Sequence, residues 1–296
     1  MSLLVTAIKL SIVLTVFGLG LHATMADATS LFRQPSKLAS SLTSMIVVMP
    51  AFAIVLATLF DLNPAVKLAL GALAISPLPP LWPKRALNAG GSSAFTIGLL
   101  AAVSLLTIIT IPVGMKIYER AFDISLVTSA GAVAKLALQT TLLPLAVGIG
   151  VRRIVPAFAE RAARPMMLLA TLLLVAASLP ILIKLWPEFG RLVGGGTLAA
   201  MTAFVIVGVV VGHVLGGPHR EERTTLALAT ASRHPAIALT LAMANAPPSN
   251  QRSVPAAILL YLILSAIVSL PYFVWAKKQG PVQDFTPRSG HHPRTA

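Results

Sequence analysis

Long apolar segments separated by short polar ones run through almost the whole chain. Hydrophobic residues make up 56% of the 296 positions and charged residues only 11%, and the mean hydropathy is +0.85. A helix needs about 20 apolar residues to cross the hydrocarbon core of a bilayer. Segments of this kind lie at about 3–21, 39–60, 65–81, 92–115, 124–150, 165–186, 196–216, 224–246 and 253–275. The pattern predicts an all-α polytopic membrane protein with nine transmembrane helices.

Basic residues gather in alternate connections, which predicts the orientation. The formal net charge is +14, and the segments 151–164, 217–223 and 276–296 are rich in lysine and arginine. Because such loops stay in the cytoplasm, we expect a cytoplasmic C-terminus, an external N-terminus and a bacterial inner-membrane location. The charge then faces anionic lipid headgroups, so no nucleic-acid partner is predicted. Residues 276–296 are polar and basic, and we expect a disordered tail there.

The acidic residues avoid the interiors of the spans. All nine fall in loops, span ends or the tail: Asp27, Asp61, Glu119, Asp123, Glu160, Glu188, Glu221, Glu222 and Asp284. A carboxylate proton relay or cation site at the midplane is therefore not expected. The chain has no cysteine, and no catalytic set or metal-ligand spacing assembles in the spans. The sequence predicts no enzyme activity, no metal and no cofactor.

The third span is interrupted by four prolines, which cannot continue a helix. They are Pro77, Pro79, Pro80 and Pro83. One interpretation is a half-helix, a break at the midplane and a second half-helix that begins near Lys84. The other is an ordinary span followed by a basic cytoplasmic loop that carries Lys84 and Arg85. The sequence leaves both interpretations open.

The eighth span carries Arg233, His234 and Pro235 at its centre, with mostly apolar residues on either side. A Lys or Arg at this depth costs roughly 2.5–3.5 kcal/mol, so it usually faces a cavity, a partner or a ligand. Proline breaks the helix here, and a new half-helix from residue 236 would direct its free N–H groups at the break, which favours an anion. Interrupted spans in corresponding halves are typical of transporters built from inverted repeats.

The predicted substrate site combines these basic clusters with nearby polar residues. Lys135 and Gln139 lie one turn apart on the fifth span and can face the site, although a tilted helix could instead bring Lys135 to the headgroups. The predicted substrate-binding residues are Lys84, Arg85, Asn88, Lys135, Gln139, Arg233 and His234. The predicted helix breaks are at Pro77, Pro79, Pro80, Pro83 and Pro235.

At these breaks the chain resembles the bile acid:sodium symporter family. In that family the fourth helix breaks at Pro-Gly-Gly-Thr-Ala-Ser-Asn, which is similar to the break after Ser76-Pro77, and the ninth breaks at Glu-x-Gly-x-Gln-Asn, which is similar to 226–238. Met49-Pro50 matches the family's Met-Pro. The resemblance implies a panel domain, a core domain and two broken helices that cross at the midplane, beside sodium ions and an organic anion. The absence of the family's first helix would explain nine spans.

Most of the family's sodium ligands are replaced in this chain. Aligned with the motifs, the Ser-Asn pair falls on Trp82 and Pro83, the glutamate on Ala229, the Gln-Asn pair on Arg233 and His234, the third-helix glutamine on Met45, and the two fifth-helix hydroxyls on Thr96 and Leu100. Sodium needs oxygen ligands, and nearly all of these side chains lack them. The substitutions favour basic side chains in place of bound ions.

These observations predict a sodium-independent secondary transporter or facilitator of a small organic anion, a carboxylate. The panel would comprise about 1–21 and 124–186, and the core about 39–115 and 196–275. His234 could also exchange a proton during transport. Two alternatives remain, a sodium-coupled organic anion symporter and a non-transporting membrane sensor or scaffold whose basic pairs are bound to backbone carbonyls. Substrate identity, direction and oligomeric state are not predicted.

Overall fold

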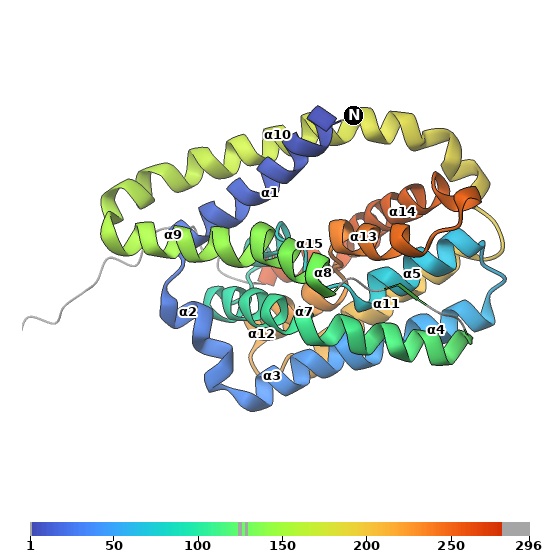
Figure 1. Ribbon diagram of the computed structural model, residues 1–296. Helices are drawn as coiled ribbons and strands as arrows, with labels where there is room; N and C mark the ends of the chain where they lie inside the picture. Colours follow the sequence, from blue (N-terminus) through green and yellow to red (C-terminus); the bar gives the residue numbers. More distant parts are fainter. Residues whose placement is uncertain (1, 124–125, 128–129, 280–296) are drawn as a thin grey trace, which may run out of the picture.

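The computed structural model describes residues 2–123, 126–127 and 130–279, and every regular element in these ranges is helical (Figure 1). The α-helices are α1 (Ser2–His22), α2 (Met25–Thr29), α3 (Pro35–Leu42), α4 (Met49–Leu59), α5 (Pro64–Ile75), α6 (Trp82–Asn88), α7 (Ser93–Phe122), α8 (Ala130–Ala137), α9 (Leu143–Ile154), α10 (Pro156–Leu192), α11 (Thr197–Leu215), α12 (Arg220–Thr230), α13 (Pro235–Asn245), α14 (Ser253–Val268) and α15 (Leu270–Gln279). The predicted all-α class is confirmed.

Six helical segments in the described ranges are long and apolar enough to cross a membrane, and the bent pair Thr6–His22 with Met25–Arg33 would make a seventh. This count of seven is two fewer than the nine predicted transmembrane helices, because the predicted spans 65–81 and 224–246 are not continuous helices. The first is divided into α5 and α6, and the second into α12 and α13. Each half is too short to cross alone, because it has at most 12 residues and a helix rises only about 1.5 Å per residue.

Two helical connections contain π-helical turns that precede a proline. Thr43–Val48 joins α3 to α4, and Leu138–Leu142 joins α8 to α9. A π-helical bond runs from an N–H to the carbonyl five residues earlier, and proline has no N–H. Pro50 therefore cannot donate to the carbonyl of Met45. Such turns are common at functional sites.

Helices α1, α9 and α10 pack against one another along one side of the molecule (Figure 1). Glycines allow the backbones of α1 and α9 to touch, since a Cβ atom at Gly20 would lie 2.6 Å from the carbonyl oxygen of Leu145 and one at Gly148 would lie 2.5 Å from that of Phe17. Ser11 donates a hydrogen bond of 2.6 Å to the carbonyl of Ala170 on α10. Small residues and interhelical hydrogen bonds are the usual means of helix packing in membranes.

The remaining long helices pack around the two divided segments, α5–α6 and α12–α13. The largest buried apolar cluster includes residues of α4, α5, α7, α11, α13 and α14. Helix α12 lies close against α11, because a Cβ atom at Gly212 would come within 2.4 Å of the carbonyl oxygen of Leu226. At the C-terminal end, α15 continues to Gln279, so residues 276–279 of the predicted tail are helical, and the rest of that tail lies outside the described residues.

The contact between α1 and α9 makes a prediction about stability. Gly148→Ala places a methyl group against the backbone of α1, and overpacking of this kind costs about 1–3 kcal/mol. Gly150→Ala on the same helix is the matched control, because a Cβ atom there has nothing within 4 Å. Thermal unfolding in lipid nanodiscs should show a lower midpoint for Gly148→Ala and an unchanged or higher one for Gly150→Ala. Equal midpoints would contradict the close packing.

Candidate functional site

The two breaks meet each other inside the protein. The backbone N–H of His234, between α12 and α13, donates to the carbonyl of Pro77 at 2.9 Å and to Oγ of Ser76 at 3.1 Å. Ser76 and Pro77 lie between α5 and α6. Backbone groups released from a helix at membrane depth must find partners within the protein. The two interruptions supply partners to each other and form one site.

Prolines define where each half-helix ends and begins. Pro77, Pro79 and Pro80 lie in the break after α5, whereas Pro83 and Pro235 occupy the first turn of α6 and α13, where a missing N–H costs no helical bond. Lys84 and Arg85 lie on the short helix α6 rather than in a loop. His234 caps α13, with its Nδ1 atom accepting a hydrogen bond of 3.3 Å from the N–H of Ile237.

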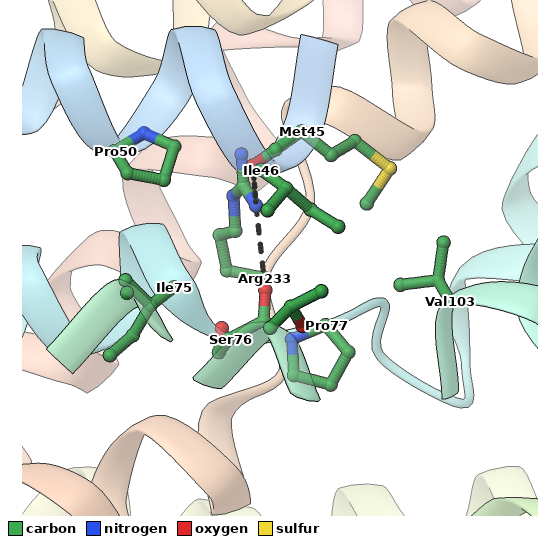
Figure 2. A pocket seen from close by; sticks show the side chains of 10 residues that line it. Met45, Ile46, Pro50, Ile75, Ser76, Pro77, Val103 and Arg233 are labelled. Carbon is green, nitrogen blue, oxygen red and sulfur yellow. Dashed lines mark hydrogen bonds between the residues drawn. The ribbon is translucent and has the colours of Figure 1, made fainter. Parts of the chain in front are cut away.

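Arg233 is the largest fully buried side chain at this site, with 1% of its surface exposed. Its Nη1 atom donates to the carbonyl of Met45 at 3.2 Å and to that of Ser76 at 3.4 Å (Figure 2). The guanidinium carbon also lies 5.7 Å from the centre of the Phe204 ring, within the range of a cation–π contact. Arg233 forms no ion pair with any residue that the structure describes.

A buried guanidinium held only by neutral oxygens is an unusual arrangement, because buried charges are normally paired with opposite charges. The Nε and Nη2 atoms of Arg233, and Nε2 of His234, are buried without a hydrogen-bond partner among the described residues. A cavity of about 20 Å³ adjoins Arg233, Ser76, Pro77 and Ile75 (Figure 2). Its size is that of one or a few water-sized groups. The site can therefore offer positive charge and free N–H donors to a ligand.

Several hydroxyl groups that sequence reasoning missed complete this site. Tyr261 and Ser265 of α14 both donate to the carbonyl of Ala231, at 2.9 and 3.0 Å. They satisfy an acceptor that the end of α12 leaves unpaired. Ser44 and Thr230 share a hydrogen bond of 3.1 Å between the π-helical turn and α12. In the sequence, these residues could have been recognised as hydroxyl side chains within otherwise apolar spans.

Lys84 and Arg85 lie on one half-helix but contact different parts of the protein. Lys84 Nζ donates to Oγ1 of Thr171 on α10 at 3.2 Å. Arg85 Nη2 donates to Oγ of Ser269 at 2.8 Å and to the carbonyl of Ala266 at 3.2 Å. Neighbouring residues on a helix do not share a face. The structure does not join either side chain to Arg233 by a hydrogen bond, and it does not gather the predicted cations into one cluster.

The remaining predicted residues are exposed. Asn88 ends α6, Lys135 lies on α8, and Gln139 lies in the π-helical turn that follows. Within the described ranges, no hydrogen bond connects these three side chains to Arg233 or His234. The same ranges contain no group of three or more His, Asp or Glu side chains that could hold a metal ion.

The comparison with known families identifies the chain. The model of the Sodium Bile acid symporter family matches residues 9–185, which is more than half of the sequence. The match includes the first break and ends before the second. No curated protein sequence matches the chain. The resemblance predicted from the motifs is confirmed: this integral membrane protein belongs to the sodium bile acid symporter family, whose members are transporters rather than enzymes.

Proposed function

We propose that the protein is a sodium-independent secondary transporter or facilitator of a small organic anion, in which the guanidinium of Arg233 takes the place of a bound cation. The observation that carries this proposal is the environment of Arg233. Its charge is fully buried and is met by the carbonyl oxygens of Met45 and Ser76 rather than by a carboxylate. Carbonyl oxygens are also the ligands that a hard metal cation takes.

Electrostatics argues against sodium at the same position. Two unit charges about 4 Å apart repel by roughly 4 kcal/mol at an effective dielectric constant of about 20. A sodium ion beside the Arg233 guanidinium would meet this repulsion without a compensating carboxylate. The positions that the family resemblance assigns to sodium ligands hold Met45, Trp82, Pro83 and Ala229, whose side chains offer no oxygen.

The charge that disfavours sodium favours an anionic substrate. The unpaired N–H groups of Arg233 and the Nε2 atom of His234 are the donors that we assign to a substrate carboxylate. The half-helix α13 begins beside them, and its dipole favours negative charge. Asn88, Lys135 and Gln139 are assigned to the path of the substrate, because they are polar and exposed and lie on or beside α6 and α8, which contact α12 and α13.

Transport requires two parts that move relative to each other, and we assign these as a panel and a core. The panel comprises α1 and α8–α10, and the core comprises α3–α7 and α11–α15. With each broken helix counted as one passage, the chain crosses the membrane nine times, with the N-terminus outside, the C-terminus in the cytoplasm and inverted repeats that cross at the breaks. Lys84 and Thr171 join the two parts at 3.2 Å. This hydrogen bond is one that alternating access would break and reform.

A non-transporting scaffold or sensor is a second candidate, because Arg85 and Arg233 both donate to backbone carbonyls. In this alternative the basic residues only stabilise the interrupted helices. A sodium-coupled symporter is a third, with ion ligands elsewhere in the chain. Substrate flux and its sodium dependence separate all three.

The first test is uptake into proteoliposomes. Radiolabelled monocarboxylates of two to ten carbons should enter at the same rate in sodium chloride and in choline chloride, because no sodium ion has to bind. Arg233→Ala should abolish uptake, and Arg191→Ala, which removes an exposed arginine, should leave it unchanged. Stimulation by sodium would support the symporter, and a lack of flux with any substrate would support the scaffold.

The second test asks whether Arg233 occupies a cation position. Arg233→Ala exposes the carbonyls of Met45 and Ser76 to a cavity from which the fixed charge has gone. Sodium or potassium should then stabilise the variant by about 2.7 kcal/mol at 100 times the dissociation constant, and should not stabilise the wild-type protein or Arg191→Ala. Thermal unfolding in nanodiscs with choline as the reference salt measures this difference. Identical salt responses in all three proteins would contradict the assignment.

A further inference from the structure

A second and larger cavity lies beside the breaks, between α5, α7 and α13. It has a volume of about 390 Å³, which falls within the range of about 300–1,000 Å³ typical of small-molecule sites. Leu68, Ala72, Met115 and Leu241 contribute to its apolar walls. Ile75 lines both this cavity and the small one at Arg233, so the two are neighbours across a single side chain.

Among the described residues that line this cavity, Lys67 provides the only charge. It forms no ion pair and no hydrogen bond with any residue in the described ranges. The other polar groups of the lining are already engaged. Tyr118 donates its hydroxyl to the carbonyl of Pro50 at 3.3 Å, and Asn245 uses its side-chain amide to bind backbone groups. Because Tyr118 and Asn245 are hydrogen-bonded within the protein, Lys67 is the polar residue of the described lining that remains available to a ligand.

The engaged polar groups fix the shape of the cavity. Asn245 accepts from the N–H of Val127 at 2.6 Å and donates to the carbonyl of the same residue at 3.1 Å. This holds the neighbouring Leu126 as part of the wall. Elsewhere in the lining, a Cβ atom at Gly71 would lie 2.8 Å from Cε1 of Tyr118. The aromatic ring thus packs directly on the backbone of α5, which fixes this part of the wall.

We propose that this cavity binds a monocarboxylate with an apolar body, whose carboxylate meets the ammonium of Lys67 and whose hydrocarbon part lies against α7 and α13. One cation and apolar walls suit one negative charge, because a second carboxylate against these walls would have no partner. The proposal rests on the proposed function, since it names the substrate class and the entry to the breaks. A substrate that moves from this cavity to Arg233 has to pass the side chain of Ile75.

Binding can be measured with octanoate, octanedioate and octanol as probes, using the full chain in lipid nanodiscs and thermal stabilisation as the readout. We expect octanoate to stabilise the protein, and octanedioate and octanol to do so at least tenfold more weakly.

Lys67→Gln should weaken octanoate binding at least tenfold, and Lys67→Arg should retain it within about threefold. Leu241→Trp should abolish binding by filling the cavity, and Lys116→Gln, an exposed lysine on α7 outside the lining, is the charge-matched control.

The outcomes distinguish this cavity from the proposed function. Octanoate binding that depends on Lys67, without uptake in proteoliposomes, would support the site and reject the transporter. Uptake with octanoate affinity unchanged in both Lys67→Gln and Leu241→Trp would support the transporter and overturn the site. Equal binding of octanoate and octanol, or of octanoate and octanedioate, would overturn the assigned ligand class. Failure of all three probes to bind the wild-type protein would also overturn the proposal.

Discussion

A backbone N–H or C=O group released from a helix at membrane depth has no water to bind, and leaving it unpaired costs several kcal/mol. The architecture around the two interrupted spans follows from this constraint. His234 donates its N–H to the opposite break, Arg233 serves the carbonyls of Met45 and Ser76, and Tyr261 and Ser265 serve the carbonyl of Ala231. Each break is tolerable because the other break and the surrounding hydroxyl groups supply its partners.

Arg233 has two roles that are coupled by this arrangement. Its Nη1 atom is a structural donor, whereas Nε and Nη2 remain buried without partners among the described residues. A fully apolar replacement would leave two carbonyls unpaired, and a carboxylate partner would neutralise the charge to which the proposed function assigns the substrate anion. A guanidinium meets both demands, because its planar group offers five N–H donors and stays charged. The cation–π contact with Phe204 supports it without consuming a donor.

The positions of the breaks could be predicted from the sequence because four prolines cluster at residues 77–83 and a basic Arg-His-Pro run lies within an apolar segment. A single proline is not sufficient, since Pro112 and Pro180 lie inside continuous helices. The ligands of Arg233 could not, because backbone carbonyls have no side-chain signature. For one of these carbonyls the sequence contains an indirect indication. Pro50 has no N–H and cannot donate to the carbonyl of Met45 five residues earlier. The expectation that Lys84 and Arg85 act together with Arg233 came from their places in interrupted segments of the two halves of the chain, and it stays a prediction. On a helix these two neighbours diverge, and one contacts α10 while the other contacts α14 and Ser269.

In the proposed function, a tethered cation would also change the energetics of transport. A bound sodium ion that enters on one side of a membrane and leaves on the other transfers the free energy of its gradient to the substrate. Arg233 cannot dissociate, so it can stabilise a substrate anion but cannot contribute a gradient to its movement. A ligand shifts a conformational equilibrium only by the difference in its affinity for the two states. If Arg233 replaces the ion, as we propose, the substrate or a proton exchanged at His234 must supply that difference. Without proton coupling, net transport would run down the substrate's own electrochemical gradient or proceed by exchange.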